Sequence, residues 1–126
     1  MTRYSYLGPA GTFTERALLQ VPGAADAERI PVANVGEALR DVTDGRSDAA
    51  MIAVENSLEG VVTAAQDALA TTPGLRILSE HLVPVSFVLV APHGQAIDDA
   101  RVVVAHPVAY GQCLRWLGEH LPSHQH

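Results

Sequence analysis

The fold of this chain is decided by residues 48–60, Asp-Ala-Ala-Met-Ile-Ala-Val-Glu-Asn-Ser-Leu-Glu-Gly. The apolar run 48–54 predicts a short buried strand, and a polar cluster follows it directly. Open α/β sheets bind ligands at the carboxyl ends of their strands. The Asn56 amide and the Ser57 hydroxyl could hold carboxylate or hydroxyl oxygens without carrying charge. The charged Glu55 must instead be paired with a cation, exposed to solvent or used by the site. The alternative is a capped loop that leads into the next helix.

A second polar turn follows a predicted strand at residues 4–7. Thr12 and Glu15 have the spacing of a capping box, so we expect a helix to begin at residue 12 or 13. Gly11 has no side chain, which would let a ligand approach the backbone of Ala10, Gly11 and Thr12 and the N–H groups of the first helical turn. An anion is the expected ligand. Many joins of this kind bind nothing, so a purely structural turn is the alternative.

A third candidate turn lies late in the chain. Residues 101–105 predict a buried strand, and Pro107 suits the first position of a helix. The turn from Ala105 through His106 to Val108 could contact a ligand, or His106 could simply be a structural histidine. The residues expected on the inward face of this helix are Ala109, Cys113, Trp116 and Leu117.

The remaining pattern alternates strands and helices. Asn34 and Glu37 form another capping box, which opens a helix that ends at Gly45. This alternation predicts an α/β fold with a largely parallel sheet. The other expected elements are strands at 29–32, 75–78 and 81–91 and a helix at 62–69.

Composition excludes several classes of protein. The chain has 126 residues, 48% of them hydrophobic and 17% charged, which is not the composition of a disordered segment. A net charge of −6 argues against nucleic-acid binding. We find no signal peptide and no apolar run of about twenty residues, so we expect a cytoplasmic protein without membrane contact. Cys113 has no partner for a disulfide, and His120, His124 and His126 belong to a polar tail that we expect to be solvated rather than metal-binding.

Three motifs together resemble the prephenate dehydratases. They are Tyr6-Leu-Gly-Pro-Ala-Gly-Thr-Phe-Thr14, Val54-Glu-Asn-Ser-Leu-Glu-Gly60 and His106-Pro107, the last followed by Gln112-Cys113 and Trp116-Leu117. They occur in the family's order, and the resemblance extends from residue 4 to about 122. The glutamate-asparagine-serine motif is the most specific of the three, and the histidine-proline pair the least.

This resemblance implies a lyase of phenylalanine biosynthesis that converts prephenate to phenylpyruvate with loss of carbon dioxide and water. The implied reaction requires no metal and no cofactor. The protein would position both substrate carboxylates, assist departure of the ring hydroxyl and exclude water. The implied substrate-binding residues are Ala10, Gly11, Thr12, Glu55, Asn56, Ser57, Ala105, His106 and Val108. We expect Gly11, Thr12, Asn56 and Ser57 to lie on one rim, at the carboxyl ends of neighbouring strands.

The resemblance also implies a bilobal fold like that of the type II periplasmic binding proteins. Residues 1–80 would form the first lobe, and residues 81–126 would begin a second lobe that is incomplete. An unfinished sheet edge would favour self-association, so a homo-oligomer is expected.

Two departures from the family pattern matter. Many members have serine and glutamine where this chain has Ala105 and Val108, so a side-chain contact is lost at each position. The family's threonine-arginine-phenylalanine motif, which carries its principal catalytic threonine, is absent, since Thr2-Arg3-Tyr4 stands at the wrong end. We therefore expect an inactive front portion of the enzyme, a fragment or a truncated product, without the regulatory phenylalanine-binding domain.

Two other readings remain open. A cytosolic effector-binding module of the same fold would bind a small molecule without chemistry, and fold alone does not distinguish it from the enzyme. A catalytically dead fragment that only dimerises is the third possibility.

Overall fold

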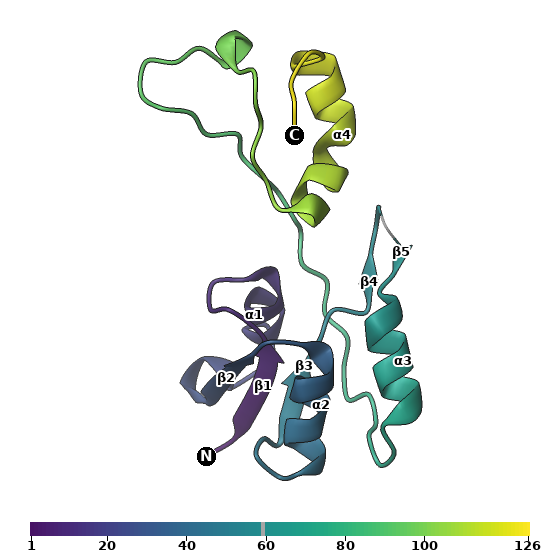
Figure 1. Cartoon of the computed structure of the whole chain (residues 1–126). Coiled ribbons are helices and arrows are strands. Elements are labelled where there is room, and N and C mark those ends of the chain that lie inside the picture. The colour runs from purple at the N-terminus through teal and green to yellow at the C-terminus, as the bar shows by residue number, and fades with distance from the viewer. Residues whose placement is uncertain (59) are drawn as a thin grey trace. The chain divides into compact units, whose positions relative to one another are not determined.

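The computed structural model describes residues 1–58 and 60–126 and divides into two compact units, Met1–Pro84 and Val85–His126 (Figure 1). Glu59, part of the second motif, lies outside the described residues. The first unit contains β1 (Arg3–Leu7), α1 (Phe13–Leu18), the 3-10 turn η1 (Ala24–Asp26), β2 (Glu28–Val32), α2 (Val35–Thr43), β3 (Ala49–Met51), β4 (Glu55–Asn56), β5 (Gly60–Val61) and α3 (Thr63–Thr71). The second contains the 3-10 turn η2 (Ile97–Asp99) and α4 (Pro107–His120).

A parallel three-stranded sheet organises the first unit, with strand order β2-β1-β3. This confirms the α/β class with a parallel sheet that the alternating pattern predicted. The central strand β1 pairs with β2 over its whole length, from Arg3 opposite Glu28 to Leu7 opposite Val32. It pairs with β3 from Tyr4 opposite Ala49 to Tyr6 opposite Met51.

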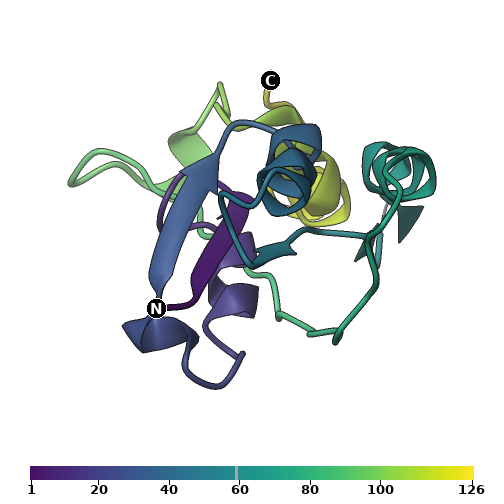
Figure 2. The ribbon, with the colours of Figure 1, turned by 90° about the horizontal axis from the view of Figure 1, so that it is seen from below.

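The helices cover opposite faces of this sheet. Successive strand residues point to opposite sides, and β1 shows this directly. Ser5 is fully buried and bonds to Asp41 on α2. Its neighbour Tyr6 packs with Leu18 of α1 and with Ala24. Figure 2 shows α1 and α2 on the two sides of the sheet, and α3 packs against α2.

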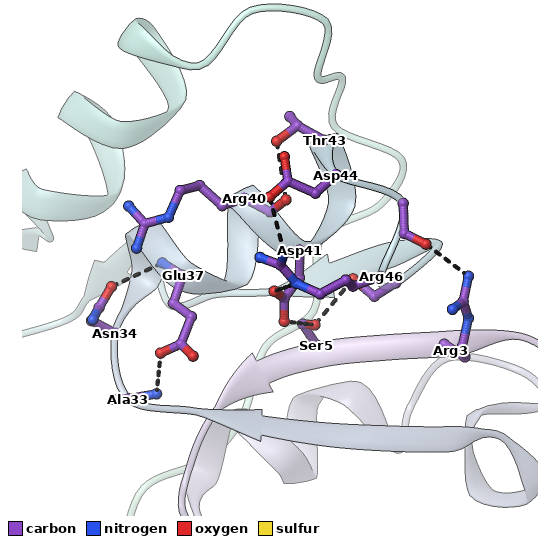
Figure 3. Close-up of polar contacts among 12 residues, drawn as sticks. Arg3, Ser5, Ala33, Asn34, Glu37, Arg40, Asp41, Thr43, Asp44 and Arg46 are labelled. Atoms are coloured by element: carbon purple, nitrogen blue, oxygen red, sulfur yellow. Dashed lines mark hydrogen bonds and ion pairs between the residues drawn. The ribbon is translucent and has the colours of Figure 1, made fainter.

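Side-chain caps fix where α1 and α2 begin. The Asn34 side chain accepts from the Glu37 N–H at 2.8 Å, and Glu37 in turn accepts from the Ala33 N–H at 3.1 Å (Figure 3). Thr12 accepts from the Glu15 N–H at 3.4 Å. Both helices therefore begin where the capping-box spacing predicted, at Phe13 and Val35.

The strand expected at 48–54 is shorter than predicted. β3 ends at Met51, and Val54 is 46% exposed. Met51 lies opposite Tyr6, one residue before β1 ends at Leu7, so the chain beyond has little strand left to pair with. An apolar run in the sequence indicates where a strand lies. The length of the strand also depends on how far its partner extends, which the run does not indicate.

Three other predicted strands are wrong. Within the described residues, 75–78 and 81–91 have no regular secondary structure. Residues 101–105 contain only an isolated bridge between Val102 and Gln125, and Val104 is 91% exposed. A strand needs a neighbour to satisfy its backbone N–H and C=O groups. These segments have the strand pattern, but apart from that bridge no strand among the described residues pairs with them.

The second unit is built around α4. Leu117 and Leu121 form a small buried cluster with Val103, and Tyr110 and Cys113 pack against it. The inward face therefore includes Cys113 and Leu117 as predicted. Trp116 was placed there wrongly, since it is 41% exposed and stacks on His120 at a ring distance of 4.1 Å.

Candidate functional site

Hydrogen bonds fix the turn after β1 at its first and last residues. The Gly8 N–H donates to the Val32 carbonyl at 2.9 Å, and the Thr12 hydroxyl donates to the Leu7 carbonyl at 3.3 Å. Gly11 has a φ of +85°, a conformation that favours glycine. The sharp return from strand to helix thus depends on Gly11 for its backbone and on Thr12 for its closure.

The Gly11 N–H does not point to open solvent. It donates to the carboxylate of Glu15, on the first turn of α1. The same carboxylate faces the Arg29 guanidinium, with 3.5 Å between Nε and Oε1. We expected this N–H to be available to an anion. In the structure, the carboxylate of Glu15 already occupies that position.

A buried tyrosine completes this group. Tyr6 lies beneath the turn at 1% exposure. Burial raises the pKa of Tyr6 above its ordinary value of 10.0, and the negative charge of Glu15 and the hydrogen bond that Tyr6 donates to its carboxylate raise the pKa further. The positive charge of Arg29 lowers it. At neutral pH the Tyr6 hydroxyl therefore keeps its proton and can donate it to Glu15 in a hydrogen bond.

The second motif lies in a hairpin rather than directly after a long strand. β4 pairs antiparallel with β5, with Asn56 opposite Gly60. The Asn56 side-chain oxygen accepts from the Leu58 N–H at 2.9 Å, closing the turn. Glu55 and Ser57 are exposed and Asn56 is half-buried. The capped-loop contact is thus present, and it uses the amide oxygen of Asn56.

The two turns leave neighbouring strands at the same edge of the sheet. β1 and β3 are parallel and adjacent. The chain after β1 continues into α1 on one face. The chain after β3 continues through the hairpin into α3, which packs against α2 of the other face. This divergence is the topological switch point at which open α/β sheets bind ligands.

The third candidate turn belongs to the second unit. His106 caps α4, and its Nδ1 accepts from the Val108 N–H at 3.2 Å. The Ala105 carbonyl faces Nε2 of His126 at 3.2 Å. The structural role considered for His106 is therefore present, and the Val108 N–H is engaged by it.

The three histidines near the end of the chain all contact protein atoms, and His120 belongs to α4 rather than to a tail. His124 lies 2.8 Å from the Tyr110 hydroxyl, His126 stacks on the Tyr110 ring at 3.7 Å, and His120 contacts the Trp116 carbonyl. Across residues 1–58 and 60–126, no group of three His, Cys, Asp or Glu side chains is placed to hold a metal ion. In the same residues, none of the helices has the length and apolarity needed to cross a bilayer.

The fold and the turns define an α/β protein with polar turns at a topological switch point. Residues 4–126 match the family described as prephenate dehydratase. The chain is 39% identical to a prephenate dehydratase of Mycobacteroides abscessus and 40% identical to one of Mycobacterium tuberculosis, in each case over 98% of this chain. The chain belongs to the prephenate dehydratase family.

A solved structure agrees with this assignment. The crystal structure of prephenate dehydratase in complex with L-Phe from Arthrobacter aurescens is 54% identical, with a TM-score of 0.83. The alignment covers 98% of this chain and 40% of that one. The chain likewise spans 42% and 41% of the length of the two mycobacterial relatives.

Sequence reasoning missed the group around Glu15. It assigned Glu15 only to the capping box and gave no role to Arg29 or to the Tyr6 hydroxyl. The only sequence signal was the capping-box spacing itself, which does not indicate that an arginine from the next strand reaches the same carboxylate. The contact depends on the pairing of β2 with β1, which places Arg29 within reach of Glu15, and spacing within α1 does not indicate that pairing.

Proposed function

We propose that this chain forms part of the substrate site of a prephenate dehydratase, a lyase that converts prephenate to phenylpyruvate with loss of carbon dioxide and water. The observation that carries the proposal is the family match over residues 4–126, which contains all three polar turns in order. The switch-point geometry of the first two turns supports it.

The proposed roles follow from the chemistry of prephenate, a dianion whose ring hydroxyl must leave as the ring becomes aromatic. The turn of Ala10, Gly11 and Thr12 lies against one carboxylate, with the Gly11 N–H bonded to Glu15 rather than to the substrate. Asn56 and Ser57 hold substrate oxygens. Glu55 is exposed beside them. The residues assigned to the site in the second unit are Ala105, His106 and Val108. These groups bind and orient the substrate, and no metal or cofactor takes part in the proposal.

We further propose that the catalytic domain is bilobal, like the type II periplasmic binding proteins. Residues 1–80 would belong to the first lobe and residues 81–126 would begin the second. The division of the chain into compact units between Pro84 and Val85 supports a boundary near this position. Self-association is also proposed, because the apolar side chains of Ile77, Leu82 and Val88 are 76%, 92% and 83% exposed.

The 126-residue polypeptide contains no threonine-arginine-phenylalanine motif. We therefore expect it to produce no measurable phenylpyruvate by itself. A longer enzyme, with residues 1–126 followed by the remaining part of the Arthrobacter aurescens relative, should turn prephenate over. Loss of a proton-donating group costs about two to four powers of ten in rate. Turnover by the short chain at the rate of the longer one would overturn this assignment of the chemistry.

The alternative is a module that binds a small molecule without catalysis. The Arthrobacter aurescens relative is described in complex with L-Phe, which makes L-Phe the probe for this reading. Titration of the 126-residue chain with prephenate and with L-Phe, followed by amide NMR, separates the two. Changes in the amide chemical shifts of residues 10–12 and 55–57 upon addition of prephenate, but not upon addition of L-Phe, favour the enzyme. Shifts there with L-Phe alone, together with an inactive longer enzyme, favour the binding module.

A further inference from the structure

Glu15 connects three parts of the first unit that lie far apart in the sequence. Its carboxylate accepts from the Gly11 N–H in the turn after β1. It faces Arg29 on β2 and lies against the buried Tyr6 hydroxyl. The Glu15 side chain is only 15% exposed and that of Arg29 only 27% exposed. A carboxylate in this position is a fixed part of the turn rather than a mobile surface group.

Arg29 is itself held in place. Its Nη1 donates to the carbonyls of Ala24 and Ala25 at 2.9 and 2.8 Å. The guanidinium is therefore anchored to η1, and the planar group can present Nε to Glu15 in one orientation. The position of the Gly11 N–H thus depends on Arg29 of β2, because Arg29 holds the Glu15 carboxylate that accepts from this N–H.

We propose that Glu15 is a positioning residue for substrate binding, which fixes the turn Gly8–Thr12 in the conformation that receives a carboxylate of the substrate. This inference rests on the proposed function. Glu15 acts through the backbone of Gly11 and the hydroxyl of Thr12, which accepts from the Glu15 N–H. It does not itself touch the substrate. Arg29 and Tyr6 hold the carboxylate that makes this possible.

The sign of the charge effect makes the inference testable. Glu15 carries a negative charge next to a turn proposed to bind a dianion. If the only influence of Glu15 were electrostatic, Glu15→Gln would remove the repulsion between this carboxylate and the dianionic substrate. It would also leave the positive charge of Arg29 without a counter-charge, and both effects would lower KM. Positioning predicts the opposite, a higher KM, because a turn that has lost the Gly11–Glu15 bond no longer holds Ala10 and Thr12 in the conformation that receives the substrate.

The experiment uses the longer enzyme that carries residues 1–126 ahead of the remainder of the Arthrobacter aurescens relative. We expect Glu15→Ala to lower kcat/KM for prephenate by about ten- to a hundredfold, the effect of a small misplacement of binding groups. Glu15→Gln keeps an oxygen that can accept from the Gly11 N–H, so it should retain more activity than Glu15→Ala. Amide NMR of the 126-residue chain should show the Gly11 resonance shifted in Glu15→Ala and less so in Glu15→Gln.

Glu37 provides the matched control. It occupies the corresponding position of the second capping box and accepts from the Ala33 N–H at 3.1 Å, at the start of α2. Glu37→Ala and Glu15→Ala remove the same kind of contact, so both should lower Tm. Only Glu15→Ala should change KM and kcat of the folded enzyme.

Each outcome is decisive. Unchanged kinetics in Glu15→Ala, whatever its loss of Tm, would reduce Glu15 to a residue that only stabilises the fold and overturn the inference. A lower KM in Glu15→Gln would overturn it in favour of simple repulsion. Both results leave the proposed function intact. A longer enzyme without any substitution that fails to turn over prephenate would remove the proposed function, and the inference with it.

Discussion

Ser5 on β1 donates its hydroxyl hydrogen to the carboxylate of Asp41 on α2, with 2.9 Å between the two oxygens (Figure 3). A hydroxyl has one hydrogen, so the 3.0 Å contact between Ser5 and Ser47 has Ser47 as the donor. Asp41 also accepts from Arg46 Nε at 2.7 Å. This buried polar group joins the centre of the sheet to the helix that covers it.

The first prediction concerns Asp41. Asp41→Ala removes the acceptor of the buried Ser5 hydroxyl and of the exposed Arg46 guanidinium, so it should lower the free energy of unfolding by about 1.5–3 kcal/mol, the range for hydrogen bonds to a charged group. Asp44 provides the control, because it pairs with the same Arg46 at 3.1 Å but its side chain is 52% exposed. Asp44→Ala should cost no more than about 1 kcal/mol. Urea unfolding at pH 7 measures both, and equal losses would contradict the prediction.

The same contact should depend on pH. The hydrogen bond from Arg46 lowers the pKa of Asp41 below its ordinary value of 3.8, burial opposes this, and the hydrogen bond from Ser5 adds to the lowering. A depressed pKa in the folded state contributes stability that is fully present above the unfolded value and is lost as pH falls through the folded one. The stability difference between the unsubstituted chain and Asp41→Ala should therefore be constant above about pH 5 and shrink below about pH 4. A difference that grows on acidification would contradict it.

The second prediction contrasts two glycines of the same turn. A Cβ on Gly8 would lie 2.7 Å from Cβ of Pro31, and the Gly8 backbone is held by its bond to Val32. Gly8→Ala should therefore cost about 1–3 kcal/mol through overpacking. A Cβ on Gly11 meets nothing within 4 Å, but its φ of +85° costs an alanine about 1–2 kcal/mol. Gly11→Asn should recover part of that cost and Gly8→Asn none. Thermal unfolding of the four variants tests this.

Much of the first unit could be predicted from the sequence because its signals are local. Asn34 with Glu37 and Thr12 with Glu15 fixed the starts of α2 and α1. In the second unit, Pro107 marked the start of α4 in the same way. Each depends on contacts within about four residues, which spacing alone specifies. The class of fold follows from the order of these elements.

Long-range pairing could not be predicted in the same way. Residues 81–91 and 101–105 are as apolar as β1, but a strand forms only where another segment satisfies its backbone groups. The sequence pattern of one segment does not indicate whether a second segment lies close enough to pair with it. The position of Asn56 in a hairpin has the same cause, since β3 ends where its pairing with β1 ends at Met51.

The third prediction tests the small core of the second unit. Leu117 is 4% exposed and packs with Val103 and Leu121. Leu117→Ala should destabilise this unit by about 2–4 kcal/mol through loss of contacts and a residual cavity. Trp116→Ala, one position away and largely exposed, should cost about 0.5 kcal/mol. Amide hydrogen exchange along α4 measures both. Faster exchange in Trp116→Ala than in Leu117→Ala would show that the inward face is wrongly assigned.

The fourth prediction separates closure of the hairpin turn by Asn56, which the structure shows, from its proposed binding of the substrate. Its amide oxygen accepts from the Leu58 N–H in an exposed part of the hairpin, so loss of that bond should cost little, on the order of 0.5 kcal/mol. In the longer enzyme, Asn56→Ala should therefore leave Tm nearly unchanged but lower turnover strongly. Asn56→Asp keeps an oxygen for the Leu58 N–H, yet it lacks the amide donor and places a negative charge next to a dianionic substrate.

Turnover and thermal unfolding on the same samples distinguish the roles. If Asn56 holds substrate oxygens, both variants lose activity, and Asn56→Asp loses it without loss of Tm. If Asn56 only closes the turn, Asn56→Asp and Asn56→Ala both stay active, and Asn56→Ala shows at most a small loss of Tm. The second result would leave Ser57 and the turn Gly11–Thr12 as the first-unit candidates for holding prephenate, because their proposed contacts do not depend on the Asn56 amide.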